Sequence, residues 1–171
     1  MSDNRQRSTS DGSRSTDATP RILVVGIGND DRGDDAIGLA IARRVRDLCL
    51  DGVGVEELSG DPLALLERWD RADTAIVIDA VSSGSIPGTV MRFDALADDV
   101  PAIFGSHVSS HGIGLGEVVA LARALERLPA RLIVYGVEGG GFDLGAPLSP
   151  NLASVIEITA RRIAEEASRK G

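Results

Sequence analysis

Residues 21–45 read RILVVGIGNDDRGDDAIGLAIARRV, and this stretch decides the fold. Its apolar run at 22–25 is rich in β-branched residues and is followed by glycine, which is typical of a buried parallel strand. After the turn, apolar residues recur with helical spacing, at Ile37, Ala40, Ile41, Val45 and Leu48. A strand, a glycine turn and an amphipathic helix in this order predict an α/β fold.

Two acidic residues, Asp34 and Asp35, lie where this helix is predicted to begin. In open α/β sheets, sites lie at the carboxyl ends of the strands, so this position suits a functional group. Two interpretations stay open here. Aspartate favours helix N-termini, so the pair can act as a cap. Alternatively, one carboxylate caps the helix while the other points into a cleft as a ligand or catalytic acid.

Length, charge and composition limit the class of protein. The chain has 171 residues, a formal net charge of -8 and 43% hydrophobic residues, which predicts an acidic globular domain. A nucleic-acid binder would carry a basic face, so no nucleic-acid partner is expected. The chain lacks an apolar run of roughly 20 residues, a secretory signal and a second cysteine besides Cys49. We therefore expect a cytoplasmic protein without a membrane partner.

The chain divides into two parts. Residues 1–19 are polar and are predicted to form a disordered extension, whereas residues 20–171 are predicted to form a single α/β domain. In this domain we expect strands at 53–58, 74–79, 89–93 and 131–137, and helices at 63–69, from 115 and from 149. The helix from 115 is expected to turn Leu125 toward the core. The strand at 53–58 suits a sheet edge, and the strand at 89–93 suits an antiparallel neighbour because its connection is short.

Candidate ligands remain once common motifs are excluded. The sequence lacks a complete dinucleotide fingerprint, a phosphate-binding P-loop and a GxSxG nucleophile elbow. Asp79 ends the strand predicted at 74–79, and the two histidines, His107 and His111, lie in a predicted loop. Asp35 and Asp79 with one of these histidines would suit a divalent metal such as zinc, nickel, cobalt or iron. Three protein ligands leave coordination positions open for a partner.

Four blocks of the sequence carry a family resemblance. GIGNDDRGDDAIGLAIA (26–42), IVIDAVSSG (76–84), SSHGIGLGEVVALARAL (109–125) and YGVEGGGFDLGAPLSP (135–150) together resemble the hydrogenase maturation proteases. These endopeptidases trim the C-terminal extension from the large-subunit precursor of [NiFe] hydrogenases. The resemblance runs from about Arg21 to Arg162 and implies a three-layer α/β/α sandwich with a twisted, mostly parallel five-stranded sheet.

The resemblance also implies a metal site. The family's two metal-binding acids correspond to Asp35 and Asp79, and its histidine corresponds to His111. His107 has no counterpart and is assigned at most a supporting place behind the ligands. The implied metal is nickel that arrives already installed in the precursor, with another divalent metal in the isolated protein as an alternative.

The expected function follows from this resemblance. We expect a monomer that binds the nickel-loaded large-subunit precursor, with Gly28 and Asn29 contacting the substrate. Asp35 and Asp79 are the expected catalytic groups, because either carboxylate or the metal can polarise the attacking water. Two alternatives stay open: a nickel-dependent binding module that does not cleave, and a self-metallated peptidase with another substrate.

Overall fold

The computed structural model describes residues 22–101, 104 and 113–168. The predicted polar extension at 1–19 and both histidines, His107 and His111, lie outside these residues, so the expectations about them stay predictions. Within the described residues, no helix is both long and apolar enough to cross a lipid bilayer.

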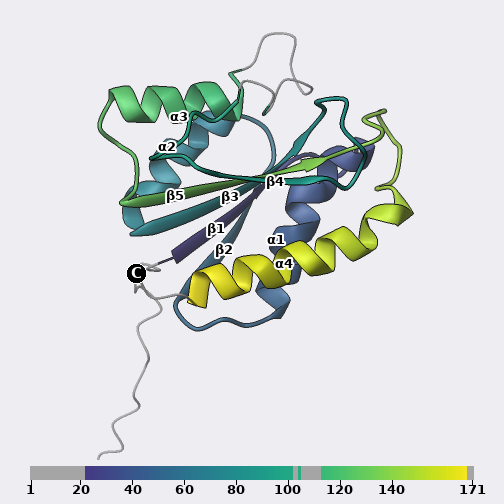
Figure 1. The fold of residues 1–171 in the computed structure, drawn as a ribbon, viewed down its shortest axis with the longest axis horizontal. Coiled ribbons are helices and arrows are strands. Elements are labelled where there is room, and N and C mark those ends of the chain that lie inside the picture. Colours follow the sequence, from purple (N-terminus) through teal and green to yellow (C-terminus); the bar gives the residue numbers. More distant parts are fainter. Residues whose placement is uncertain (1–21, 102–103, 105–112, 169–171) are drawn as a thin grey trace, which may run out of the picture.

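Five strands form one twisted sheet (Figure 1). They are β1 (Ile22–Ile27), β2 (Val53–Leu58), β3 (Thr74–Val81), β4 (Val90–Asp94) and β5 (Arg131–Glu138). Their order is β2-β1-β3-β5-β4, and every neighbouring pair is parallel except β4 with β5. The predicted mostly parallel five-stranded sheet is confirmed, as are the edge position of residues 53–58 and the antiparallel strand after Gly88.

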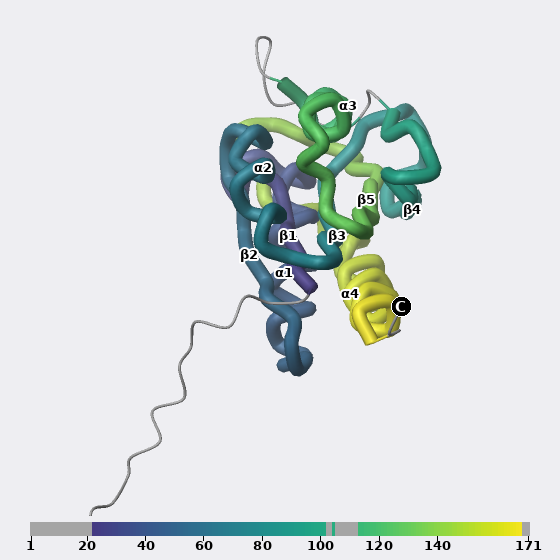
Figure 2. Tube along the Cα trace, turned by 90° about the vertical axis from the view of Figure 1, so that its left-hand side faces the viewer, coloured from purple at the N-terminus to yellow at the C-terminus, as the bar shows by residue number. Residues whose placement is uncertain are grey.

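Helices cover both faces of the sheet. The helices α1 (Ile37–Asp47) and α4 (Ala153–Ser168) lie on one face, and α2 (Leu65–Arg68) and α3 (Leu115–Ala124) lie on the other (Figures 1 and 2). Buried strand residues alternate between these layers: Val24 and Ile76 join the core beneath α1 and α4, whereas Leu23 joins the core beneath α2 and α3. This arrangement is the predicted α/β/α sandwich.

Three local predictions need correction. Asp79 does not end its strand, because Ala80 and Val81 continue the pairing with β5. The helix predicted at 63–69 is only the single turn of α2 between two 3₁₀ turns, and Asp61 caps the first of these 3₁₀ turns by accepting a hydrogen bond from the Leu63 amide. Leu125 was expected on the inward face of α3, but the helix ends at Ala124 and leaves Leu125 52% exposed.

Two glycines bring α1 directly onto the sheet. A Cβ atom added to Gly38 would lie 2.2 Å from the Ile27 carbonyl oxygen and 2.6 Å from that of Ile78. A Cβ atom on Gly26 would lie 2.3 Å from the Gly38 carbonyl oxygen. Because only glycine fits at these contacts, the start of α1 is held against the ends of β1 and β3. The turn that precedes α1 therefore lies at the edge where the parallel strands end, which we call the carboxyl edge.

Candidate active site

The acidic pair lies in a 3₁₀ turn, η1 (Gly33–Ala36), which leads from β1 into α1. Both carboxylates are buried, with Asp34 0% and Asp35 2% exposed. The residues at the N-cap positions of η1 and α1 are Arg32 and Ala36, and neither makes a side-chain capping bond. The pair thus precedes α1 as predicted, but the two aspartates do not occupy its N-cap.

Asp34 bonds to a distant loop instead of capping the helix. Its carboxylate accepts hydrogen bonds from the amides of Gly140 (2.7 Å) and Gly141 (3.1 Å), and from both the amide (2.8 Å) and the hydroxyl (3.0 Å) of Ser149. Burial acts to raise the pKa of Asp34, but these hydrogen bonds outweigh it and hold the pKa below its ordinary value. Asp34 is therefore an ionised group whose acceptor capacity is used within the protein.

Asp79 has a very different environment on the neighbouring strand β3. Its side chain is 4% exposed, and its Oδ2 accepts no hydrogen bond from the described residues. Burial raises the pKa of Asp79 to about 8, the charge of Asp35 adds to this shift, and the Ala80 amide opposes it. The turn η1, which carries Asp35, packs against β3, and the charge of Asp35 reaches Asp79. The convergence of the two carboxylates on one ion stays a prediction.

These two acids belong to the expected metal site. Their oxygens suit a divalent cation, whose charge would offset the repulsion and desolvation that raise the pKa of Asp79. Within residues 22–101, 104 and 113–168, no three His, Cys, Asp or Glu side chains are grouped as metal ligands. The third expected ligand, His111, lies outside these residues, so the complete set Asp35, Asp79 and His111 stays a prediction.

The glycine turn after β1 packs directly against the backbone of the acidic turn. Gly28 is buried at φ 152°, and a Cβ atom there would lie 2.0 Å from the Asp35 carbonyl oxygen. Asn29 is partly exposed, and its Oδ1 accepts a hydrogen bond of 2.9 Å from the Asp31 amide. Gly28 is thus needed to admit the backbone of Asp35, and substrate contact by Gly28 and Asn29 stays a prediction.

The sequence analysis missed Glu138, the last residue of β5. This carboxylate is 1% exposed and accepts hydrogen bonds from the amides of Ser83, Gly84 and Ser85 and from the Ser83 hydroxyl. These hydrogen bonds fix residues 83–85, the loop that follows β3. The strand β3 is the one that contains Asp79. The available signal was an acid at the end of an otherwise apolar strand, the same pattern that singled out Asp79.

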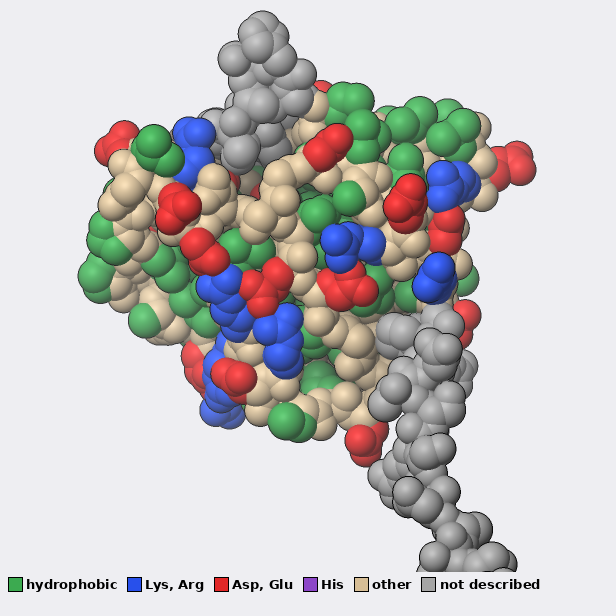
Figure 3. Space-filling view, turned by 180° about the vertical axis from the view of Figure 1, so that it is seen from behind, with side chains coloured by type: hydrophobic (Ala, Val, Ile, Leu, Met, Phe, Trp, Pro, Cys, Tyr) green, Lys and Arg blue, Asp and Glu red, His purple; other side chains and the backbone are tan. Residues whose placement is uncertain are grey.

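Charges elsewhere on the surface are largely paired. On the face seen in Figure 3, basic and acidic side chains lie next to one another. Ion pairs join Arg43 to Asp30 and Glu57, and Arg46 to Glu57. The acids at the carboxyl edge differ from these exposed ion pairs in being buried, with Asp35 2% and Asp79 4% exposed.

Comparison with known proteins identifies the family. A family model described as "Hydrogenase maturation protease" matches residues 59–166, which is more than half of the chain. The chain belongs to this family.

Individual relatives of the chain support its assignment to the hydrogenase maturation protease family. The chain is 32% identical to the hydrogenase 2 maturation protease of Escherichia coli over 146 residues, covering 84% of this chain and 88% of that protein. It is 34% identical to the hydrogenase expression/formation protein HupD of Thiocapsa roseopersicina, covering 78% of this chain but only 61% of HupD. The fold matches the hydrogenase maturating endopeptidase HybD from E. coli with a TM-score of 0.72 and 28% identity, covering 86% and 94% of the two chains. Maturation proteases and endopeptidases hydrolyse peptide bonds, so the chain is classed with the hydrolases.

Proposed function

We propose that this chain is an endopeptidase that removes the C-terminal extension of a [NiFe] hydrogenase large-subunit precursor after nickel has been inserted. In this proposal Asp35, Asp79 and His111 bind the nickel carried by the precursor. The observation that carries the proposal is the pair of buried carboxylates at the carboxyl edge, Asp35 and Asp79. Membership of the maturation protease family supports the choice of substrate.

The protonation of Asp79 supplies a physical reason for dependence on nickel. With its pKa raised to about 8, Asp79 is mainly protonated near neutral pH when no cation is present. A divalent cation beside the pair favours the ionised form, because it offsets both the burial and the charge of Asp35. A precursor without nickel would therefore meet a site with one charge fewer, and discrimination would come from this difference in binding.

Cleavage requires an activated water near the bound nickel. Asp35 or Asp79 would accept the proton of this water as it attacks the scissile carbonyl, acting as a general base. The peptide bond then breaks, and the released C-terminal fragment takes up the proton at its new amino group. The cation contributes by polarising the water or the carbonyl.

Processing of a purified precursor tests the proposal. The nickel-loaded and the nickel-free precursor are each incubated with the protein, and mass spectrometry follows the loss of the C-terminal fragment. We expect loss only from the loaded precursor, and strong reduction in the Asp35→Ala, Asp79→Ala and His111→Ala variants. Asp51→Ala serves as the control, because Asp51 is exposed in the turn between α1 and β2.

Each alternative predicts a different outcome. Full cleavage by both the Asp35→Ala and the Asp79→Ala variant would overturn the assignment of these acids. Binding of the loaded precursor without any mass loss would identify a non-cleaving module. Tight metal in the isolated protein, together with cleavage of nickel-free substrates, would identify a self-metallated peptidase.

A further inference from the structure

The two adjacent aspartates of the acidic turn differ in their bonding. Asp34 accepts four hydrogen bonds from residues 140–149, as described above, while Asp35 lies in the same turn beside β3 and its charge acts on Asp79. We propose that Asp34 is a positioning residue that fixes Asp35 relative to Asp79 by anchoring η1 to the loop between β5 and α4. The inference deepens the proposed function and rests on it, since it takes Asp35 as a functional group.

Backbone hydrogen bonds also connect residues 31–34 to residues 141–146 of the loop. The Asp34 amide donates to the Gly141 carbonyl (2.8 Å), the Gly33 amide to the Ala146 carbonyl (2.9 Å), and the Gly145 amide to the Asp31 carbonyl (2.7 Å). These backbone bonds add to the hydrogen bonds of the Asp34 carboxylate. The acidic turn is therefore bonded to the loop through both its backbone and its side chain. Rotation of η1 would break several of these bonds together, so the direction of Asp35 is strongly constrained.

Close packing leaves little room for adjustment at this contact. A Cβ atom on Gly33 would lie 2.6 Å from the Gly141 carbonyl oxygen, and one on Gly139 would lie 2.9 Å from the Asp34 Cβ. The Asp34 side chain therefore has little freedom to move relative to the loop. Because Asp35 follows it directly in a tight 3₁₀ turn, a displacement of Asp34 is passed on to Asp35 through one peptide unit.

Asp34 itself is poorly suited to bind a metal or a substrate. All four of its hydrogen bonds come from the protein, and its side chain is 0% exposed. Such a carboxylate orients its neighbour, as partners behind metal ligands do in many proteins. The tandem aspartates thus divide their roles, with Asp34 holding the turn and Asp35 left as the expected functional group.

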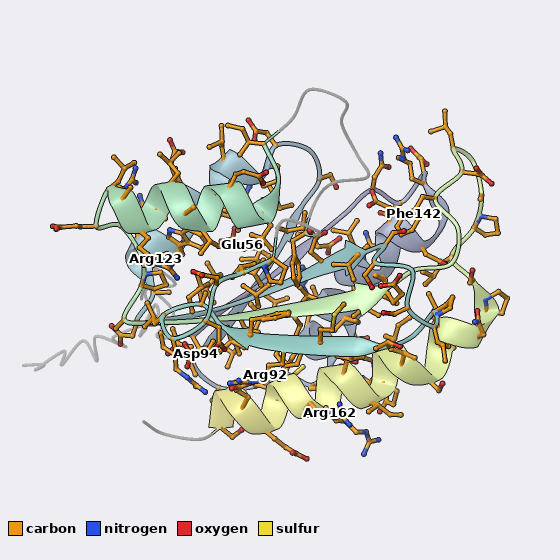
Figure 4. All side chains as sticks on the ribbon, turned by 45° about the horizontal axis from the view of Figure 1, so that its top comes forward. Glu56, Arg92, Asp94, Arg123, Phe142 and Arg162 are labelled. Atoms are coloured by element: carbon orange, nitrogen blue, oxygen red, sulfur yellow. The ribbon has the colours of Figure 1, made fainter. Side chains whose placement is uncertain are left out.

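A matched control is available at the other end of β5. Glu166 of α4 is also a buried carboxylate, 8% exposed, that accepts hydrogen bonds from Arg92, Arg131 and Tyr135. Arg131 opens β5, whereas the loop held by Asp34 follows the end of that strand. Figure 4 shows Arg92 near α4, well separated from Phe142 of the loop. Glu166→Gln therefore removes a comparable buried charge at a distance from the carboxyl edge.

The test compares Asp34→Asn, Ser149→Ala and Glu166→Gln with the wild-type protein. For each we measure kcat and KM for the nickel-loaded precursor, Ni²⁺ affinity by calorimetry with the metal alone, and unfolding in urea. An Asn side chain offers its amide to donors, so Asp34→Asn loses part of the contact. We expect its kcat and Ni²⁺ affinity to fall about 10- to 100-fold, with KM changing less than kcat. Ser149→Ala removes only the hydroxyl donor, and we expect a smaller loss in the same direction.

Glu166→Gln separates positioning from general destabilisation. We expect it to lower stability in urea while kcat and Ni²⁺ affinity stay close to wild type. The inference is overturned if Asp34→Asn loses no more kcat than Glu166→Gln when both are compared at equal folded fraction. If Asp34→Asn does not fold, Ser149→Ala decides, because unchanged kcat and Ni²⁺ affinity in that variant overturn the inference and a reduction supports it. If the wild-type protein leaves the precursor uncut, the proposed function fails, and the Ni²⁺ titration then decides the role of Asp34.

Discussion

Asp79 makes the stability of the metal-free protein depend on pH in an unusual direction. Burial and the charge of Asp35 raise the pKa of Asp79 to about 8 in the folded protein, whereas an aspartate in an unfolded chain titrates near about 3.9. Between these values the folded protein keeps a proton that the unfolded chain has released. Rising pH therefore favours unfolding, and the stabilising effect of protonation is complete only below the unfolded value.

The expected magnitude follows from proton linkage. One proton of difference changes the free energy of unfolding by about 1.4 kcal/mol per pH unit. Between pH 5 and pH 7 the contribution of Asp79 to stability should fall by about 3 kcal/mol, and the slope should disappear above about pH 8. Asn has the same shape and does not titrate, so Asp79→Asn should lose this slope and gain stability relative to wild type as the pH rises.

Urea unfolding of metal-free protein at several pH values between 5 and 8 measures the effect. The quantity of interest is the difference in unfolding free energy between the wild type and Asp79→Asn, since other titrating groups are common to both. Asp51→Asn, at an exposed position in the turn between α1 and β2, is the matched control substitution. A constant difference for Asp79→Asn as well would refute the reasoning, because it would mean that Asp79 is ionised in the folded protein.

Three further predictions concern residues around the site and on the surface. Glu138→Gln removes the carboxylate that accepts hydrogen bonds from the Ser83 loop, and we expect the free energy of unfolding in urea to fall by about 2–3 kcal/mol. Wild-type stability of this variant would contradict the role of Glu138 in fixing the loop. Gly38→Ala places a Cβ 2.2 Å from the Ile27 carbonyl oxygen, so thermal denaturation should reveal a loss of at least about 3 kcal/mol, and a normal Tm would show that α1 can shift without cost. Arg43→Ala should cost under about 1 kcal/mol in urea, because this side chain is 43% exposed, and a larger loss would show that its ion pairs are poorly screened.

Much of the fold could be predicted because burial leaves a clear pattern in the sequence. The apolar runs that became β1, β3 and β5 lie between layers of helices, so nearly every residue in them is apolar. Periodicity likewise predicted α1. The end of β3 could not be predicted, because the extra pairs that Ala80 and Val81 form depend on β5 as a partner. The short α2 was also missed, since apolar spacing does not distinguish one α-helical turn from flanking 3₁₀ turns.

The candidate site was only partly predictable for a related reason. Asp35 and Asp79 could be expected near each other, because the strand before Asp35 and the strand that contains Asp79 end at the same edge of the sheet. The roles of Asp34 and Glu138 depend on backbone amides of distant loops. Amides are present at every residue except proline, so the sequence carries no particular sign of which loop supplies them. Only the folded chain shows that these two acids are held by the protein itself.

The bonding between η1 and the β5–α4 loop has a consequence for when activity can arise. The residues that Asp34 bonds lie more than 100 positions later in the chain, since Gly140 is separated from it by 106 residues. Closing so long a segment is entropically costly and tends to come late in folding. A chain still emerging from the ribosome would therefore lack an ordered acidic turn. Under the proposed function, cleavage would therefore begin only after residues 140–149 have been synthesised and have bonded to η1.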